Sequence, residues 1–344
     1  MKTTLLVGSF VACIVSAAGQ AHAAVCTPTG FFRDAINMTA ALINPPGTVT
    51  GSVDATGCNI GVYYDGGHNA RVTADVFGAN YFGILVNTDN GGFSHVTIKG
   101  SVVHHIGEVP HNGTQHGVGI YLRGFAGAIK GDVDGNWVFD YQKGGITANG
   151  PGINVDITNN VVTGDGHVPF IAQNGIQMAF GASSNVITDN YVYGNSFIGF
   201  PGDGSTSAGI LIAGGAGVGQ CPPANADCGY DLNIVIRGNT LVANDTGVYV
   251  FNGDANSNPP STPTNVWVMS NTIYGDLCYN QSYQAGVADV GNRDKIIGNT
   301  IYGPGYTACA SGTTIDVSDA TDPTVTNHLP QHRPHPHDGH DRDD

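Results

Sequence analysis

The sequence has 344 residues, a formal net charge of −15 and only 11% charged residues. So few basic residues cannot form the long positive surface that nucleic acids or anionic membranes require, and we expect neither as a partner. The 51 glycines stand beside β-branched residues and asparagines, which is typical of many short strands joined by turns.

The N-terminus has the three parts of a secretory signal. Lys2 precedes an apolar run from Leu5 to Ala18, and Ala21-His22-Ala23 follows before Ala24. We therefore predict a signal peptide over residues 1–23 and a secreted protein, periplasmic or extracellular. No other stretch is apolar enough to predict a transmembrane segment.

The segment that follows predicts a helix. Between residues 31 and 43 apolar side chains recur at helical spacing, Asp34 lies near the start, and Pro45-Pro46 ends the run. We interpret it as an N-terminal capping helix.

The cysteines predict disulfides. Cys13 lies in the signal, which leaves an even set in an exported chain. The short CxxC spacing of zinc sites is absent, so free or metal-bound thiols are the less favoured alternative. The expected local pairs are Cys26–Cys58, Cys221–Cys228 and Cys278–Cys309.

A short phrase, apolar-x-x-Asn-x-apolar, recurs along the chain at intervals of about 24 residues or more, a period typical of solenoids. Asp75 and Ser101 take the Asn position in the first two copies. A second phrase, Gly-(Ile/Val)-x-apolar, lies between most copies and predicts three short parallel strands per turn. The Asn copies, which we expect to form an internal hydrogen-bonded ladder with rungs about 4.8 Å apart, are Asn136, Asn160, Asn190, Asn239, Asn271 and Asn299.

This pattern resembles the right-handed parallel β-helix of the pectate-lyase-like superfamily, with its PbH1-type repeats. The resemblance implies an all-β solenoid of about eight or more rungs over residues 24–320. Residues 321–344 are rich in Asp, Pro and His and predict a disordered tail, whose histidines either collect a transition metal or are simply solvated. The Arg-Pro-x-x-Arg motif of pectate lyases is absent, so no catalytic residue is carried over from a named family.

One outer strand face predicts a binding surface. In the Gly-(Ile/Val) strands alternate residues point outward, and their row spacing suits a sugar chain lying along the solenoid axis. The alternative is an ordinary solvated face. The outward residues of three successive rungs are Tyr121, Arg123, Thr147, Asn149 and Gln177.

Loops that enter these strands concentrate the unusual residues of the chain. We expect them to form one wall of a groove, with the insertion at residues 197–230 as the next wall or a lid. Solvation or turn formation is the alternative for each residue. The candidates are Glu108, His116, Asp140, Tyr141, Lys143, Asp165 and His167.

Two reactions fit such a groove. In β-elimination from a uronide, Arg123 would neutralise the carboxylate and Lys143, Tyr141 or His116 would remove the proton. Calcium is the expected cofactor, held by the oxygen ligands of Glu108, Asp140 and Asp165. In glycoside hydrolysis, Asp140 and Asp165 would be the carboxylate pair.

We therefore expect a secreted monomer that acts on a polysaccharide or cell-wall glycan as a lyase or glycoside hydrolase. Tyr141 and His167 are added to the outward patch as expected substrate contacts. The alternative is a non-catalytic carbohydrate-binding or cell-surface structural β-helix, because this fold does not specify one reaction.

Overall fold

The computed structural model describes residues 25–198, 204–215, 229–254, 256 and 258–327. The predicted signal peptide, the Cys221–Cys228 pair and the tail from His328 lie outside these residues. In the described part of the chain, no helix is both long and apolar enough to cross a membrane.

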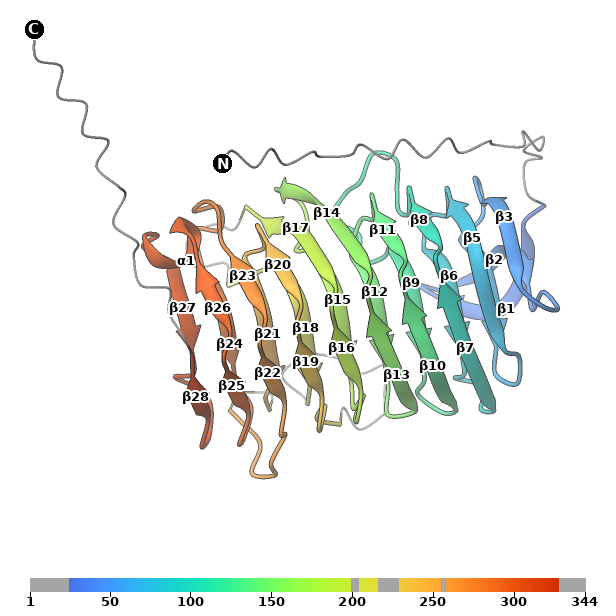
Figure 1. The fold of residues 1–344 in the computed structure, drawn as a ribbon. Helices are drawn as coiled ribbons and strands as arrows, with labels where there is room; N and C mark the ends of the chain where they lie inside the picture. Colours follow the sequence, from blue (N-terminus) through green and yellow to red (C-terminus); the bar gives the residue numbers. More distant parts are fainter. Residues whose placement is uncertain (1–24, 199–203, 216–228, 255, 257, 328–344) are drawn as a thin grey trace, which may run out of the picture.

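The chain forms a parallel β-helix, as predicted, in which three strand faces wind around one core (Figure 1). Face 1 is an 11-stranded sheet made of β1 (Thr27–Arg33), β2 (Ile36–Ile43), β4 (Ile60–Asp65), β6 (Phe82–Asn87), β9 (Val118–Arg123), β12 (Gly144–Asn149), β15 (Asn174–Ala179), β18 (Ala208–Gly214), β21 (Thr246–Asn252), β24 (Gln284–Asp289) and β27 (Gly312–Asp316).

The other two faces join into a single 17-stranded sheet, because β5 pairs with β7 through its first half and with β8 through its second. Face 2 consists of β3 (Val49–Asp54), β5 (Ala70–Phe77), β7 (Phe93–Lys99), β10 (Ala128–Asp134), β13 (Ile153–Thr158), β16 (Val186–Thr188), β19 (Val235–Arg237), β22 (Trp267–Met269), β25 (Lys295–Ile297) and β28 (Thr324–Thr326). Face 3 consists of β8 (Val102–His104), β11 (Trp137–Phe139), β14 (Val161–Val168), β17 (Tyr191–Phe197), β20 (Thr240–Val242), β23 (Thr272–Tyr274) and β26 (Thr300–Tyr302).

The predicted asparagine ladder is present inside the solenoid. The backbone N–H and the side-chain amide of Asn136 both donate to Asn160 Oδ1 at 2.9 Å, and the same pair of bonds links Asn160 to Asn190. Because each buried amide is satisfied by the next rung, the ladder fixes the stacking of the turns. It continues through Asn239, Asn271 and Asn299 to Asn327.

Glycine begins the second repeated phrase because the core approaches the backbone there. A Cβ atom at Gly145 would lie 2.3 Å from a methyl carbon of Val162 and 2.6 Å from the Gly175 carbonyl oxygen. The core side chains that follow each glycine, such as Ile146 and Ile176, are fully buried.

The predicted capping helix over residues 31–43 is wrong. This segment is an antiparallel hairpin of β1 and β2, in which Asp34 and Ala35 form the turn with positive φ angles of 52° and 62°. β2 also pairs in parallel with β4. A helix would leave the backbone groups of β4 unpaired at the sheet edge, whereas the hairpin satisfies them.

The predicted domain boundary at residue 320 is too early. β28 pairs with β25, and Asn327 Oδ1 accepts the last bond of the ladder from the backbone N–H of Asn299 at 2.9 Å. The one short helix of the described residues, α1 (Pro304–Thr307), precedes β27. Two predicted disulfides, Cys26–Cys58 and Cys278–Cys309, are confirmed.

Candidate functional site

The outer surface of face 1 carries the predicted patch. The strands align so that Tyr121, Thr147 and Gln177 stand in one row across β9, β12 and β15. Arg123 and Asn149 stand in the neighbouring row. The predicted outward direction of these side chains is consistent with this register, because the residues between them belong to the core.

The hairpin covers the first rungs of this surface. Phe82 and Leu85 of β6 point outward yet have no exposed area, because they belong to a second hydrophobic cluster with Met38 of β2 and the half-buried Phe31. The Arg33 guanidinium lies 5.4 Å from the centre of the Phe82 ring. The outer surface of face 1 is therefore closed at its N-terminal end.

Beyond the hairpin, at β12, the outward side chains are shorter, and the surface is hollow. A pocket of about 610 Å³, which we name the N-terminal pocket, has a floor that includes Gly144, Thr147 and Asn149. Its wall comes from the hairpin turn, at Phe31, Phe32, Arg33 and Asp34, and from Gln115.

Two further pockets continue along the same surface. The middle pocket, of about 410 Å³, shares Lys143, Gln177 and Phe180 with the N-terminal pocket. The C-terminal pocket, of about 320 Å³, shares Thr206 and Tyr249 with the middle one. The three pockets together form what we name the groove. Within the segment predicted as wall or lid, Gly204, Ser205 and Thr206 line the groove from a loop, whereas Ala208–Gly214 is not an insertion but strand β18 of face 1, whose Leu211 and Ala213 line the middle pocket.

Arg123 is fixed at the border between the covered and the open surface. Its Nε donates to Asp89 Oδ2, its Nη1 donates to Tyr121 Oη at 3.4 Å, and its guanidinium lies 4.7 Å from the centre of the Phe125 ring. Burial opposes the charge of Arg123, but Tyr121 and Asp89 outweigh it, so the pKa of Arg123 is raised. Arg123 is therefore a permanent and well-oriented cation.

Lys143 is the opposite kind of cation. It precedes β12 and lines both the N-terminal and the middle pocket. Its Nζ donates to the Ala172 carbonyl oxygen at 2.8 Å, and no carboxylate of the described residues lies within ion-pair distance. Burial without a counter-charge lowers the pKa of Lys143 to about 8, so roughly a tenth of this amine is neutral at pH 7 and about half of it near pH 8.

A chain of polar contacts crosses the groove floor. Tyr121 Oη accepts from Arg123 and also from Asn149 Nδ2 at 3.2 Å. Gln177 Nε2 donates to Asn149 Oδ1 at 3.2 Å. Because the Tyr121 oxygen accepts two bonds and no acceptor for its hydrogen is found among the described residues, its O–H can donate to a ligand.

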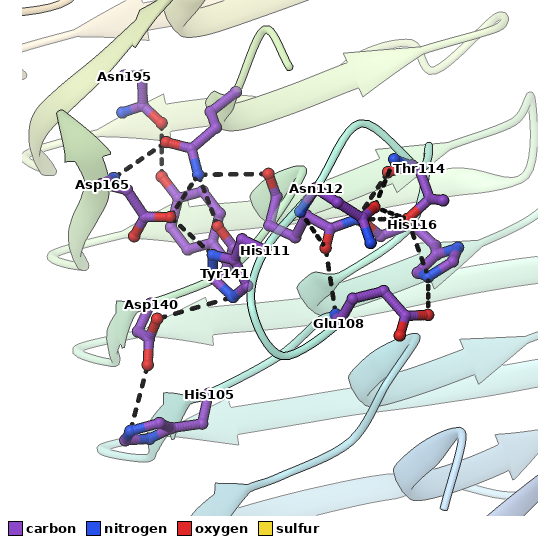
Figure 2. Close-up of polar contacts among 12 residues, drawn as sticks. His105, Glu108, His111, Asn112, Thr114, His116, Asp140, Tyr141, Asp165 and Asn195 are labelled. Atoms are coloured by element: carbon purple, nitrogen blue, oxygen red, sulfur yellow. Dashed lines mark hydrogen bonds and ion pairs between the residues drawn. The ribbon is translucent and has the colours of Figure 1, made fainter. Parts of the chain in front are cut away.

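The predicted loop carboxylates gather outside the groove. Asp140 and Asp165 both approach the ring of His111, as Figure 2 shows. Glu108 instead pairs with His116, at 3.0 Å between Oε1 and Nε2. The three carboxylates predicted for calcium are thus divided between two neighbouring clusters, and none of them lines the three pockets.

Three other predicted site residues also lie outside the groove lining. Tyr141 is fully buried and donates to Asn195 Oδ1 at 2.5 Å, so its prediction as a base or a substrate contact is wrong. His116 is 6% exposed and stacks on Tyr81 at 3.8 Å between ring centres. His167 contacts Ser196 Oγ through Nδ1 at 2.9 Å.

Sequence reasoning missed the hairpin wall and the acidic end of the groove. Asp316 and Asp319 line the C-terminal pocket, where Tyr283 Oη donates to Asp316 Oδ2 at 2.7 Å. Arg33 was hidden inside the segment interpreted as a helix. The groove therefore runs from a cationic end to an acidic end.

Comparison with known proteins shows solved structures of similar fold. No family model matches the chain, and no curated protein matches it. Among solved structures it is similar to the Dettilon tailspike protein, with 15% identity and a TM-score of 0.41 over 84% of this chain and 61% of that one.

Two further solved structures are also similar to this chain. The DFA-IIIase from Arthrobacter chlorophenolicus A6, without its lid and in complex with GF2, has 13% identity and a TM-score of 0.43 over 78% of this chain and 66% of that one. The alginate lyase from Paenibacillus sp. str. FPU-7 has 11% identity and a TM-score of 0.28 over 76% of this chain and 91% of that one. The chain spans 61% of the length of the tailspike protein and about two thirds of that of the DFA-IIIase, and similarity at this level describes the fold alone.

Proposed function

We propose that the groove binds an anionic polysaccharide and that the N-terminal pocket cleaves it by β-elimination. The observation that carries this proposal is that two different basic residues line one pocket. Arg123 keeps its positive charge at all ordinary pH values, whereas Lys143 has no carboxylate partner and a lowered pKa. Arg33 is the third basic residue of that pocket, in a chain with only 12 lysines and arginines. Asp34 and Asp89 lie beside Arg33 and Arg123, so Lys143 is the cation of this pocket whose charge is not offset by a neighbouring carboxylate when it is protonated. A local positive charge of this kind attracts an acidic glycan despite the negative net charge of the chain.

Each residue has a defined part in the proposed reaction. Arg123 binds the uronate carboxylate and stabilises the charge that develops on it when the neighbouring C5–H bond breaks. The lone pair of the neutral Lys143 amine takes the C5 proton, the electrons of the C5–H bond form the C4–C5 double bond, and the electrons of the C4–O bond leave with the oxygen. The Tyr121 hydroxyl donates its proton to the departing oxygen, because it can donate toward a ligand in this pocket.

The carboxylates favour elimination over hydrolysis. Hydrolysis needs two carboxyl groups that flank the scissile bond. Among the described residues of the N-terminal pocket the only carboxylate is Asp34, which lies 3.6 Å from Arg33 Nε. Asp140 and Asp165, the pair predicted for hydrolysis, face His111 instead.

We also propose that the protein acts outside the cytoplasm. Two disulfides are typical of an oxidising compartment. A secreted monomer that meets a cell-wall or extracellular glycan is consistent with them, and calcium stays a prediction.

The experiment is a substrate panel of pectate, alginate, a glycosaminoglycan and a neutral glycan, with ultraviolet absorbance reporting unsaturated ends and a second assay reporting reducing ends. We expect absorbance on an acidic glycan and a rate reduced by a factor of about 10² to 10⁴ in Lys143→Met, because general base catalysis is lost. Lys130→Met, which alters an exposed lysine of β10, is the matched control. Reducing ends without absorbance would replace elimination with hydrolysis, and binding without any product would leave a non-catalytic glycan-binding protein.

A further inference from the structure

A line of imidazole and carboxylate groups follows the corner of the solenoid where face 3 turns toward face 1. The fold stacks its members, because His105 and Asp140 occupy the same turn in consecutive rungs and the Ile106 N–H donates to the Asp140 carbonyl oxygen at 2.9 Å. His111 reaches the same corner from the loop between β8 and β9 (Figure 2). In order along the corner, the contacts join Asp75, His104, His105, Asp140, His111 and Asp165.

The tautomer of His111 is set by its partner. His111 Nδ1 lies 2.8 Å from Asp165 Oδ2, and this carboxylate is itself held by Gln173 Nε2 at 3.0 Å. The Gln173 side-chain oxygen also accepts from the Asp165 backbone N–H at 2.9 Å. A proton on Nδ1, donated to Asp165, leaves the lone pair of His111 on Nε2.

That Nε2 atom faces Asp140. His111 Nε2 lies 3.7 Å from Asp140 Oδ1, and His105 Nε2 lies 3.2 Å from Asp140 Oδ2. Bonds of about 2.0 to 2.2 Å from zinc to nitrogen and oxygen place two ligands of one ion roughly 3 to 4 Å apart. Each of the two imidazole nitrogens is therefore at ligand spacing from the Asp140 carboxylate, which links the two rings.

We propose that His105 Nε2, His111 Nε2 and the Asp140 carboxylate bind one divalent transition-metal ion, with Asp165 positioning His111. Two imidazole nitrogens with one carboxylate suit zinc or iron(II) better than calcium, which prefers oxygen ligands only. A carboxylate on the far nitrogen of a ligating histidine is the usual support of such a site. This site is separate from the groove and does not depend on its function.

The corner is open to ions from solvent. The His105 side chain is 61% exposed and that of Asp140 is 38% exposed, whereas that of His111 is 15% exposed. His111 is thus held in place by the protein, whereas the exposed side chain of His105 can turn toward an ion that enters from solvent.

The test measures zinc binding to the full-length mature chain by calorimetry, with His328, His332, His335, His337 and His340 all replaced by Ser so that the tail does not contribute. We expect one ion per chain. The ion should be lost in His111→Ala and weakened by about 10- to 100-fold in Asp165→Asn, because the latter removes only the positioning carboxylate. Cobalt(II) bound in place of zinc should give the strong visible absorbance of a four-coordinate site.

His68→Ala is the matched control, because His68 makes a comparable exposed contact with Asp65 away from this corner. His105→Ala changes an exposed side chain and gives a second variant if His111→Ala fails to fold, as judged by its thermal melt. Zinc bound by His111→Ala and His105→Ala as tightly as by the parent would overturn the proposal. Loss of zinc in these two variants together with retention in His68→Ala would support it.

Discussion

Leu85 and Leu211 stand in the same outward row of face 1, yet they lie in different environments. The row runs from Leu85 through Tyr121, Thr147 and Gln177 to Leu211. Leu85 is completely buried beneath the hairpin, whereas Leu211 is partly exposed in the middle pocket. The repeat therefore determines the direction of a side chain, but a segment far away in sequence determines whether solvent reaches it.

The largest expected effect comes from a substitution beneath the hairpin, at the N-terminal end of face 1. Leu85→Ala should lower the free energy of unfolding by about 2 to 5 kcal/mol, because it leaves a cavity between the hairpin and face 1. Leu211→Ala, the matched change in the open part, should cost less than about 1 kcal/mol. Urea unfolding followed by circular dichroism measures both. Equal costs would show that the hairpin does not bury the first rungs in solution.

A second change fills the open part. Gln177→Trp places a large ring at the border of the N-terminal and middle pockets, where Gln177 is partly exposed and can be enlarged without disturbing the core. We expect an acidic oligosaccharide to bind at least about tenfold more weakly, a change of about 1.4 kcal/mol, with stability nearly unchanged. Thr163→Trp on face 3 is the control. Unchanged affinity in Gln177→Trp would place the ligand elsewhere.

The repeat made much of this architecture predictable. Asn136, Asn160 and their equivalents satisfy one another inside the solenoid, so the ladder follows from spacing alone. The outward direction of Tyr121 and Arg123 follows from alternation along a strand. Both depend on local periodicity, which a single sequence displays.

The hairpin and the loop clusters depend on contacts between distant segments. Phe31 and Met38 are compatible with helical spacing, and only their packing on Phe82 of a later rung selects the hairpin. The repeat placed Asp140 and Asp165 in neighbouring rungs. The ring of His111, which both carboxylates contact, comes from an irregular loop. No repeat encodes such a loop, so the partners of these carboxylates could not be predicted.

Lys143 and Arg123 line the same pocket but differ in how their charge depends on pH. The pKa of Lys143, lowered to about 8 by burial, means that its charge disappears as pH rises through this value, whereas the raised pKa of Arg123 keeps that side chain charged. From about pH 7 to about pH 9.5 an acidic oligosaccharide should bind roughly threefold to tenfold more weakly. Over the same range the elimination rate at saturation should rise, because the neutral base accumulates. Lys143→Arg should bind with little pH dependence and lose the elimination; a parent affinity independent of pH would contradict the assignment.

The same lysine affects stability with a definite sign. Because the pKa of Lys143 is about 8 in the folded protein and has the ordinary lysine value of 10.5 in the unfolded chain, the unfolded chain binds more protons between these values. The contribution of Lys143 to the free energy of unfolding should therefore increase as pH rises from about 8 to about 10.5. The difference between the parent and Lys143→Met, measured by urea titration across this range, isolates it. A difference that stays constant with pH would show that Lys143 is not desolvated.

The smallest expected effect concerns the hairpin turn itself. Arg33 Nη2 donates to the Gln115 carbonyl oxygen at 2.7 Å, which ties the turn to the loop that completes the pocket wall. Because this bond is exposed, Arg33→Ala should lower the free energy of unfolding by less than about 1 kcal/mol. It should nevertheless weaken binding of an acidic oligosaccharide about threefold, since one cation and one anchor of the wall are lost. Arg71→Ala, on the exposed side of β5, removes the same charge far from the pocket and should leave affinity unchanged; equal weakening in both variants would mean that net charge, rather than the hairpin wall, governs binding.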